Sequence, residues 1–436
     1  MSNVLRIEPI VEKLILFLKG EHLTTLAIEA GFVKRAPRKI DPKSFLIGLF
    51  LRVLQGTTSL SSLAMSLGLL KGIRISKQAV SKRINESVVR FLEGVLAHTI
   101  AQKLQNIRKI IPSTFSRILI HDSTIVRLPS ELAQVFPGNR NQTHQDFALV
   151  KIQAVYNILK EQFCWFWISP FTVNDQSIAS TMFEYVQRGD LLIRDLGYFV
   201  LNALTNLQQR GAFFITRSRH GIAVSDLESE RRVKLLKRLR KYPFFDSWII
   251  AGVKEQVKVR LIAIPVDSAV AAERRRRLKR NRDHRLNPSK EHLALLGWNM
   301  FLLNVDAQTL SPQDVAALYG IRWRIETIFK AWKGYFRLAT FSTTSVVQVR
   351  ISLYALLILI TLFHTFIVAP SSKFMATTGC ASISLLKLSR YFKEQFWAVA
   401  LYMFRPAVLY DQLTYHCMYD KRHDRSNYHQ KLLSLG

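Results

Sequence analysis

The sequence predicts an α/β fold, in which a mixed sheet is interrupted by a mostly β insertion and flanked by helical N-terminal and C-terminal regions. Three observations predict this architecture. Apolar residues recur at helical spacing through most of residues 1–110. Apolar runs of strand length, separated by turn residues, follow between residues 115 and 219. After a basic stretch of changed composition at 220–300, another apolar run and a capped helix return the chain to the sheet.

The charge of the chain narrows the class of its partners. Its 436 residues include 62 Lys and Arg against 31 Asp and Glu, a formal net charge of +31. Such an excess opposes a compact fold unless a polyanion is near, so nucleic acid is the first partner to consider and a membrane surface the second. Three widely separated cysteines argue against a disulfide framework or a zinc cluster. The N-terminus has acidic residues and no signal-peptide cleavage pattern, so we expect a cytoplasmic protein.

Residues 1–110 are predicted to form a helical domain that binds DNA. Helical spacing is strong at 9–20, 43–56 and 87–104, with Gly and Pro residues between these segments. Ser76 can cap a further helix whose exposed side offers amide, hydroxyl and cationic groups. The residues expected to recognise DNA there are Lys77, Gln78, Ser81, Lys82 and Arg83. A solvated basic helix is the alternative, and base-specific readout stays open.

The middle of the chain has the order of elements of a ribonuclease H-like sheet. The first predicted element is a buried strand at 118–120, within the alternating run 115–128, with Asp122 at its end. The elements that follow are strands at 148–159 and 163–173, a helix at 175–187, a strand at 191–193, a helix at 200–211 and a strand at 212–219. In that topology the first and fourth strands are neighbours. Asp122 and Asp195, each at the end of its apolar run, are therefore expected to lie side by side. For either aspartate alone, a strand-ending or helix-capping role is the alternative.

The segment from 220 to 300 is basic and contains a hairpin pattern. The run from Arg274 to Arg285 is either a solvated or disordered basic stretch or a set of phosphate contacts, and the charge of the chain favours the contacts. Trp248 and Trp298 could stack on an unpaired DNA base, with core packing as the alternative.

The apolar segment at 351–368 is about long enough to cross a bilayer. It is interrupted by Ser352, Thr361, His364 and Thr365 and stands alone, so we interpret it as a buried helix and expect no membrane. A membrane-anchored basic protein is the competing interpretation. The tail from about residue 371 is predicted to be helical and basic.

The stretch from Ser311 to Lys333 carries the most informative pattern. Ser311, Pro312 and Asp314 make a helix start with a capping box, and the helix is expected to run to about Gly334. The polar residues on this helix are Tyr319, Arg322, Glu326 and Lys333. At about 100° per residue they fall within about 60° of one another around the helix axis. A solvated face with an ordinary Arg and Glu pair is the alternative.

One sheet could bring together three carboxylates, those of Asp122 and Asp195 on two strands and that of Glu326 on a helix. Mg²⁺ prefers oxygen ligands, and two such ions bridged by a carboxylate can activate a water or a 3′-OH on one side of a phosphodiester. Arg322 and Lys333 could hold the neighbouring phosphates, and Tyr319 could hydrogen-bond a phosphate or brace Glu326.

The chain resembles a DDE transposase of bacterial insertion sequences, of insertion sequence family four. That branch is marked by Tyr-x2-Arg-x3-Glu-x6-Lys, which is present as Tyr319, Arg322, Glu326 and Lys333. The contexts of the two aspartates, HDST and RDLGYF, also match. The resemblance implies a ribonuclease H-like core, a helical domain that binds the element's ends, a dimeric complex on DNA and a cut-and-paste reaction through a hairpin. It also implies a base flipped onto a tryptophan, and whether Trp248 or Trp298 serves stays open.

We therefore expect a transposase that cleaves the ends of its element with Mg²⁺, or Mn²⁺ in its place, and joins the 3′-OH ends to target DNA. The alternative is a catalytically silent DNA-binding descendant of such an enzyme. The expected segments are a DNA-binding domain at 1–110, the catalytic core at 111–219 and 301–370, the insertion at 220–300 and the C-terminal tail at 371–436. The location expected is the prokaryotic cytoplasm, at the nucleoid.

Overall fold

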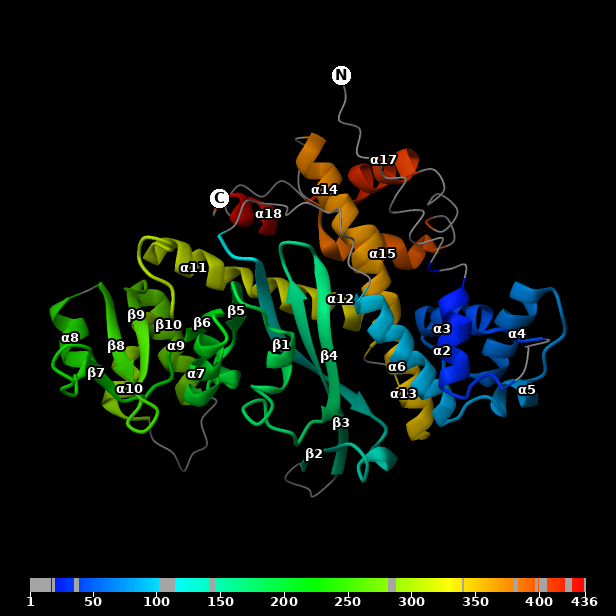
Figure 1. Ribbon diagram of the computed structural model, residues 1–436, viewed down its shortest axis with the longest axis horizontal. Coiled ribbons are helices and arrows are strands. Elements are labelled where there is room, and N and C mark those ends of the chain that lie inside the picture. Colours follow the sequence, from blue (N-terminus) through cyan, green and yellow to red (C-terminus); the bar gives the residue numbers. More distant parts are fainter. Residues whose placement is uncertain are drawn as a thin grey trace. The chain divides into compact units, whose positions relative to one another are not determined.

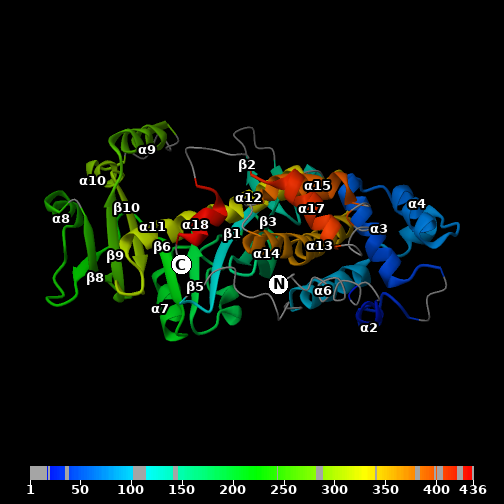
Figure 2. The ribbon, with the colours of Figure 1, turned by 90° about the horizontal axis from the view of Figure 1, so that it is seen from above.

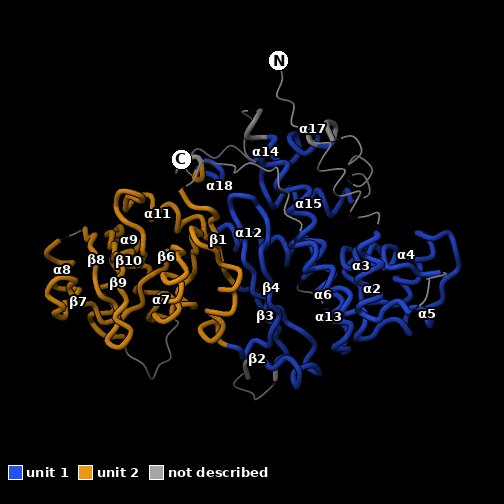
Figure 3. The backbone as a smooth tube through the Cα atoms, in the orientation of Figure 1, with its two compact units in different colours: residues 1–111, 123–173, 323–430 blue, residues 112–122, 174–322, 431–436 orange. Residues whose placement is uncertain are grey.

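The structure of the protein is a computed structural model. The chain divides into two compact units, which are drawn in different colours in Figure 3. The residues described are 17, 20–34, 39–101, 114–140, 146–242, 244–280, 288–338, 341–378, 383–396, 399, 406–419 and 426–434. Unit 1 comprises residues 1–111, 123–173 and 323–430, and unit 2 comprises 112–122, 174–322 and 431–436. Most of the predicted helix at 9–20, the end of the basic run at 281–285 and residues 420–425 of the predicted C-terminal tail lie outside the described residues.

Helices make up the N-terminal part of unit 1, as predicted (Figure 1). They are α2 (Glu21–Glu29), α3 (Pro42–Gln55), α4 (Leu60–Lys71), α5 (Lys77–Ser81) and α6 (Glu86–Ala101). Helix α3 begins where the Asp41 carboxylate accepts the Ser44 N–H at 2.9 Å and ends at Gly56, whose left-handed φ of 67° suits glycine. Helices α3 and α6 both pack against α13 (Val346–Phe363), so these helices share a core with a segment far along the chain.

The apolar segment is a helix buried inside unit 1. It runs through α13 (Val346–Phe363), the π-helical turn η4 (His364–Val368) and α14 (Ala369–Thr378). By length and composition it could cross a membrane, yet 89% of its most apolar window is buried in the protein. Burial in a core accounts for its hydropathy, as expected for the buried-helix interpretation.

The strands of unit 1 form an antiparallel pair, β3 (Asp146–Asn157) and β4 (Gln162–Pro170), with the short β2 (Pro137–Arg140) on the first residues of β3. Helix α12 (Trp323–Gly334) packs on this pair through Trp332, whose ring contacts Phe163 and Phe166. The predicted strands at 148–159 and 163–173 are therefore confirmed.

The strands of unit 2 form a mixed sheet. β1 (Arg117–Leu128) pairs in parallel with β5 (Asp190–Arg194), and β5 pairs in parallel with β6 (Phe213–Arg217), with α7 (Leu201–Gln209) between them in sequence. β1 continues past Asp122 into unit 1. The resulting order β4, β3, β1, β5, β6 is that of a ribonuclease H-like sheet, which confirms the predicted fold class.

The insertion extends the same sheet. Its strands are β7 (Val224–Asp226), β8 (Phe245–Ala251) and β9 (Val257–Pro265), and β9 pairs with β10 (Trp298–Leu303), which pairs with β6. The predicted hairpin is β8 and β9. The described part of the insertion also carries the helices α8 (Leu235–Lys241), α9 (Ser268–Arg280) and α10 (Lys290–Leu295). Figure 2 shows α9 lying alongside α10, and Arg275 of α9 donates to the Leu293 carbonyl at 2.9 Å.

Three local predictions are wrong. Asp122 lies in the middle of its strand, because the alternating residues after it continue β1 to Leu128. The helix expected at 175–187 is a series of turns with a short 3₁₀ segment, η2 (Thr181–Tyr185), since Asn174 accepts the Gln176 N–H and closes a local turn instead. The helix from Ser311 is divided into α11 (Pro312–Ile321) and α12 at Arg322, whose N–H bonds three residues back to Tyr319.

A buried ionic network fixes the first turn of α12 in unit 1. The Arg324 guanidinium donates to both carboxylate oxygens of Glu161, at 3.0 and 3.2 Å, and both side chains are almost fully buried. Tyr156 lies between Glu161 and His364, with its oxygen 3.1 Å from His364 Nδ1. Burial, the largest single cause, would lower the pKa of Arg324, but the Glu161 carboxylate together with the neighbouring tyrosines outweighs it and the net direction is upward. The guanidinium therefore stays charged.

Acid is expected to destabilise unit 1 through its buried histidines. Burial lowers the pKa of His364 well below 6.5 and that of His429 to about 4. Below pH 6.5 each of these histidines becomes protonated in the unfolded chain but stays neutral in the folded chain. The free energy of unfolding therefore falls as the pH falls from about 6.5 towards 4. Each group contributes a slope of about 1.4 kcal/mol per pH unit in that window. Urea unfolding of wild type and His429→Gln at several pH values measures it; identical slopes in the two proteins would contradict the assignment.

Candidate active site

Two aspartates meet on neighbouring parallel strands of unit 2. In the register of β1 and β5, His121 pairs with Arg194, so Asp122 and Asp195 follow as the next pair. Asp195 begins the short turn η3 (Leu196–Tyr198), but its side chain makes no capping hydrogen bond. The structure thus bears out the expected neighbourhood and gives Asp195 no helix-capping role.

The residue before each aspartate anchors its strand. His121 is fully buried with its ring 4.3 Å from that of Tyr198, and the Arg194 guanidinium lies over the rings of Phe183 and Tyr198. Burial lowers the pKa of Arg194 to about 9. Successive strand residues point to opposite faces, so this packing turns the two aspartates to the other face of the sheet. Sequence reasoning did not name His121 or Arg194 as packing residues, although each directly precedes one of the aspartates.

The signature residues of unit 2 contact the aspartates directly. Arg322 Nη1 donates to Asp122 Oδ2 at 2.9 Å, and Tyr319 Oη donates to Asp195 Oδ1 at 3.3 Å. Burial first, and the Asp195 charge second, raise the pKa of Tyr319 above its ordinary value, so the phenol stays a donor. Arg322 is largely buried and also lies over the Tyr319 ring, 5.8 Å from its centroid. The pattern Tyr-x2-Arg therefore places one hydrogen-bond donor on each aspartate.

A second cationic cluster adjoins Tyr319. The Arg217 guanidinium lies 5.7 Å from the Tyr319 ring centroid, and Arg217 and Arg274 both donate to Asn299 Oδ1, at 2.6 and 2.8 Å. Burial and the Arg217 charge lower the pKa of Arg274. Two like charges on one neutral amide suit an anion such as a DNA phosphate. Sequence reasoning named the Arg274 run but not Arg217 or Asn299, because no local pattern joins β6, α9 and β10.

Glu326 and Lys333 lie on α12 of unit 1. They line an open pocket of about 610 Å³, whose other lining residues are Ser123, Thr124, Phe329, Lys330 and Gly334. Ser123 and Thr124 directly follow Asp122 in β1. Burial lowers the pKa of Lys333 from its ordinary value. Lys330 is a further cation here that sequence reasoning did not name.

The fit to a divalent metal rests on the chemistry of the donors. Carboxylate oxygens on neighbouring strands are the ligands that Mg²⁺ and Mn²⁺ prefer. Within the described residues, no three Asp, Glu, His or Cys side chains lie close enough together to hold an ion. Asp122 and Asp195 thus form a pair of oxygen donors in unit 2, and Glu326 belongs to unit 1.

The tryptophans differ in exposure. Trp298 on β10 and Trp248 on β8 are half-buried, and the Lys258 ammonium lies 5.8 Å from the Trp248 ring. Trp323, the first residue of α12, is 64% exposed and was not named from sequence. Because an exposed ring offers a face for stacking, Trp323 is a further candidate, beside Trp248 and Trp298, for stacking on an unpaired DNA base.

The predicted recognition helix begins as expected. Ser76 Oγ accepts the Ala79 N–H at 3.2 Å and caps α5, but the helix ends at Ser81. The expected contacts Lys77, Gln78, Ser81 and Lys82 are exposed, whereas Arg83 is half-buried and donates to the Ala79 carbonyl. Recognition of DNA ends by these residues stays a prediction.

Known proteins resemble this chain over most of its length. A family profile described as "Transposase DDE domain" matches residues 113–362. The transposase for insertion sequence element IS231F of Bacillus thuringiensis subsp. israelensis is 28% identical over 378 residues, which cover 81% of this chain and 79% of that protein. The transposase for element IS1151 of Clostridium perfringens is 27% identical over 403 residues, covering 85% of this chain and 84% of that protein.

Among solved structures, a piggyBac transposase synaptic complex with hairpin DNA aligns with 95% of this chain and 87% of that chain. The TM-score is 0.47 and the sequence identity is 11%.

Proposed function

Because this chain belongs to the DDE transposase family, we propose that it binds the inverted ends of an insertion sequence, cleaves them by metal-dependent hydrolysis and joins the 3′-OH ends to target DNA. The observation that carries this proposal is the aspartate pair in unit 2. Asp122 and Asp195 occupy adjacent positions on parallel strands, each with a donor from the Tyr-x2-Arg pattern. A protein that only bound DNA would gain nothing from carboxylates placed among phosphate-binding cations.

The family implies a divalent metal, and we assign it to Asp122, Asp195 and Glu326, as two Mg²⁺ ions or Mn²⁺ in their place. Such ions, when bound, activate the attacking oxygen and stabilise the leaving oxygen of the phosphodiester. Arg322 is held against Asp122 and would exchange that carboxylate for a DNA phosphate as the acidic groups take up metal. Tyr319 keeps the Asp195 carboxylate in place through its hydrogen bond.

The remaining cations are assigned to the DNA backbone. Lys333 and Lys330 in the α12 pocket, and Arg217 with Arg274 in unit 2, would hold phosphates on either side of the cleaved bond. We assign recognition of the ends to α5 and expect two copies of the chain to act together on two ends. The protein would act in the bacterial cytoplasm, at the nucleoid.

The direct test is cleavage of a labelled DNA fragment that carries the element's end. Purified protein with Mg²⁺ or Mn²⁺ is expected to nick the end, to form a hairpin on the flanking or element side, and to join the released 3′-OH to a target plasmid. EDTA is expected to stop every step. Binding of the correct end without cleavage in both Mg²⁺ and Mn²⁺ would instead favour the silent DNA-binding descendant.

A base-stacking role is expected for Trp323. Its exposed ring can stack on an unpaired base, and base stacking is worth about 1–3 kcal/mol. Trp323→Ala is therefore expected to slow hairpin formation by roughly 5- to 150-fold without changing the first nick, and Trp323→Phe to retain most of the rate. Trp248→Ala and Trp298→Ala are measured in parallel by single-turnover gels. A larger effect at Trp298 or Trp248 would move the role to that residue.

A further inference from the structure

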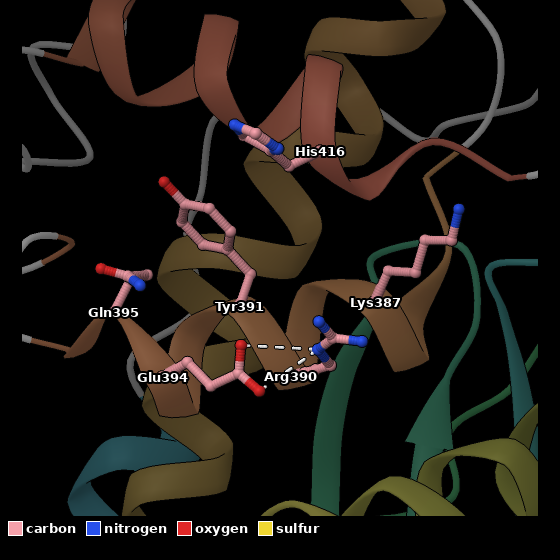
Figure 4. Close-up of a pocket in the computed structure, with 6 residues that line it drawn as sticks. All are labelled: Lys387, Arg390, Tyr391, Glu394, Gln395 and His416. Atoms are coloured by element: carbon pink, nitrogen blue, oxygen red, sulfur yellow. Dashed lines mark hydrogen bonds and ion pairs between the residues drawn. The ribbon is translucent and has the colours of Figure 1, made fainter.

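A pocket of about 430 Å³ lies between two C-terminal helices of unit 1, α15 (Leu385–Glu394) and α17 (Pro406–Cys417) (Figure 4). The residues that line it are Lys387, Arg390, Tyr391, Glu394 and Gln395 from α15 and its C-cap, and His416 from α17. The α15 residues recur at helical spacing and share one face of the helix. The buried face of the same helix is formed by Leu385, Leu388 and Phe392. The polar face is thus not needed for the core.

The backbone holds the two walls of this pocket together. Ser384, the N-cap of α15, donates its N–H to the carbonyl of Cys417, the last residue of α17, at 2.8 Å. Ile383 and Met418 form an isolated β-bridge beside it. Burial raises the pKa of the Cys417 thiol to about 12, so no thiolate forms beneath the pocket at neutral pH. These backbone contacts therefore hold the start of α15 beside the end of α17.

Aromatic rings lie in the pocket, from Tyr391 and His416, and beside it, from Tyr415. The rings of Tyr391 and His416 are stacked, with centroids 5.8 Å apart and an interplanar angle of 24°. Tyr415 is 75% exposed and meets His416 edge to face at 4.9 Å. Tyr415 and His416 are exposed and Tyr391 is half-buried. Aromatic rings that reach the surface in this way offer faces to a ligand.

Cations lie beside these rings. Lys387 and Arg390 come from the same helix face as Tyr391, and Arg390 is paired with Glu394 at 3.2 Å. Both members of this pair are more than half exposed, so the pair contributes little and Arg390 can exchange Glu394 for another anion at small cost. Glu394 therefore occupies the position that a phosphate would take.

We propose that the α15–α17 pocket binds single-stranded DNA, with an unpaired base against Tyr391 and His416 and the adjoining phosphates on Lys387 and Arg390. Aromatic faces beside cations are the combination by which proteins hold single strands without reading their sequence. Bases in a duplex are stacked inside it and cannot reach these rings, so the single strand is favoured. The proposal rests on the proposed function, because an enzyme that cuts element ends exposes unpaired strands.

The first test is local photocrosslinking of the full chain. A short oligothymidylate carrying 5-iododeoxyuridine is irradiated with the protein, and the crosslinked residues are identified by mass spectrometry. Crosslinks are expected at Tyr391, Tyr415 or His416, and an excess of duplex is expected to leave them in place. Crosslinks confined to other parts of the chain, or equal competition by duplex, would overturn the proposal.

The second test is binding of the same oligonucleotide by fluorescence anisotropy. Tyr391→Ala is expected to weaken binding by roughly 5- to 150-fold, and Glu394→Gln to tighten it by about two- to five-fold because Arg390 is released. Lys387→Ala is expected to lower the slope of log affinity against log salt by about 0.7. Lys393→Ala removes the same charge from α15 outside the pocket and is the matched control; an effect equal to that of Lys387→Ala would count against the pocket.

Cleavage of end DNA is measured in the same variants. Normal cleavage together with no crosslink in the pocket would overturn this inference and leave the proposed function standing. Absence of cleavage by wild type together with crosslinks in the pocket would overturn the proposed function and leave this inference standing.

Discussion

Replacing Asp195 with asparagine is expected to reduce cleavage of end DNA by on the order of 10³-fold or more, with binding of the DNA nearly unchanged. The amide keeps the size of the side chain and can still accept the hydrogen bond that Tyr319 donates at 3.3 Å. It loses the negative charge that a divalent ion requires of its ligands. A fall in the rate of the chemical step, at unchanged affinity for the end, is the expected signature.

The other two carboxylates are expected to behave alike. Asp122→Asn and Glu326→Gln should each cause a loss of similar size, and pairing either with Asp195→Asn should add little, because residues that act as one unit are not additive. The matched control is Asp226→Asn, an aspartate of unit 2 that pairs with Arg238 away from the site. Rates are taken from single-turnover gels and affinities from gel shifts. More than a tenth of wild-type cleavage in Asp195→Asn would rule out its assigned role.

Replacing Glu161 with glutamine is expected to lower the free energy of unfolding by about 3–5 kcal/mol, since removing one partner of a buried pair leaves the other charge uncompensated. Arg324 is 2% and Glu161 0% exposed at the side chain. Glu161 also adopts a left-handed backbone, with φ of 53°, a conformation that a glutamate holds only where its surroundings require it. The pair joins the turn between β3 and β4 to the first turn of α12.

Urea unfolding at neutral pH measures this effect. Glu161→Leu combined with Arg324→Met is expected to be more stable than Glu161→Gln, because no buried charge is then left alone. Glu273→Gln, which breaks an exposed pair on α9, is the control and is expected to change stability little. A Glu161→Gln protein as stable as wild type would show that water or another group compensates Arg324.

The sequence predicted helix starts and a hairpin correctly where the pattern involves residues close together in the chain. The Ser311 and Asp314 capping box, with Pro312 after it, is present as predicted, and so is the cap that Ser76 gives to α5. The alternating run of β8 and β9 forms the expected hairpin. These succeed because a cap or an alternation involves residues within a few positions of one another.

Predictions failed where competing interactions decide an element's limits. The sequence predicts a strand end at Asp122 because a charged residue follows an apolar run. Pairing in the sheet instead extends β1 to Leu128. The helix from Ser311 is broken at Arg322, where the backbone tightens and the side chain reaches Asp122. The pairing of β1 in the sheet and the contact of Arg322 with Asp122 both join residues far apart in sequence, so neither leaves a local signal.

The sequence by itself determined the fold class and the residue types of the site: the two aspartates at matching strand positions and the spaced Tyr319, Arg322, Glu326 and Lys333. Spacing along a chain can do this because helix and strand periodicities are local. Only the tertiary structure decided which groups meet. Arg322 on Asp122, the two arginines on Asn299, and the pocket of α15 and α17 join segments far apart in sequence. Such contacts depend on strand order and helix packing, which no short pattern encodes.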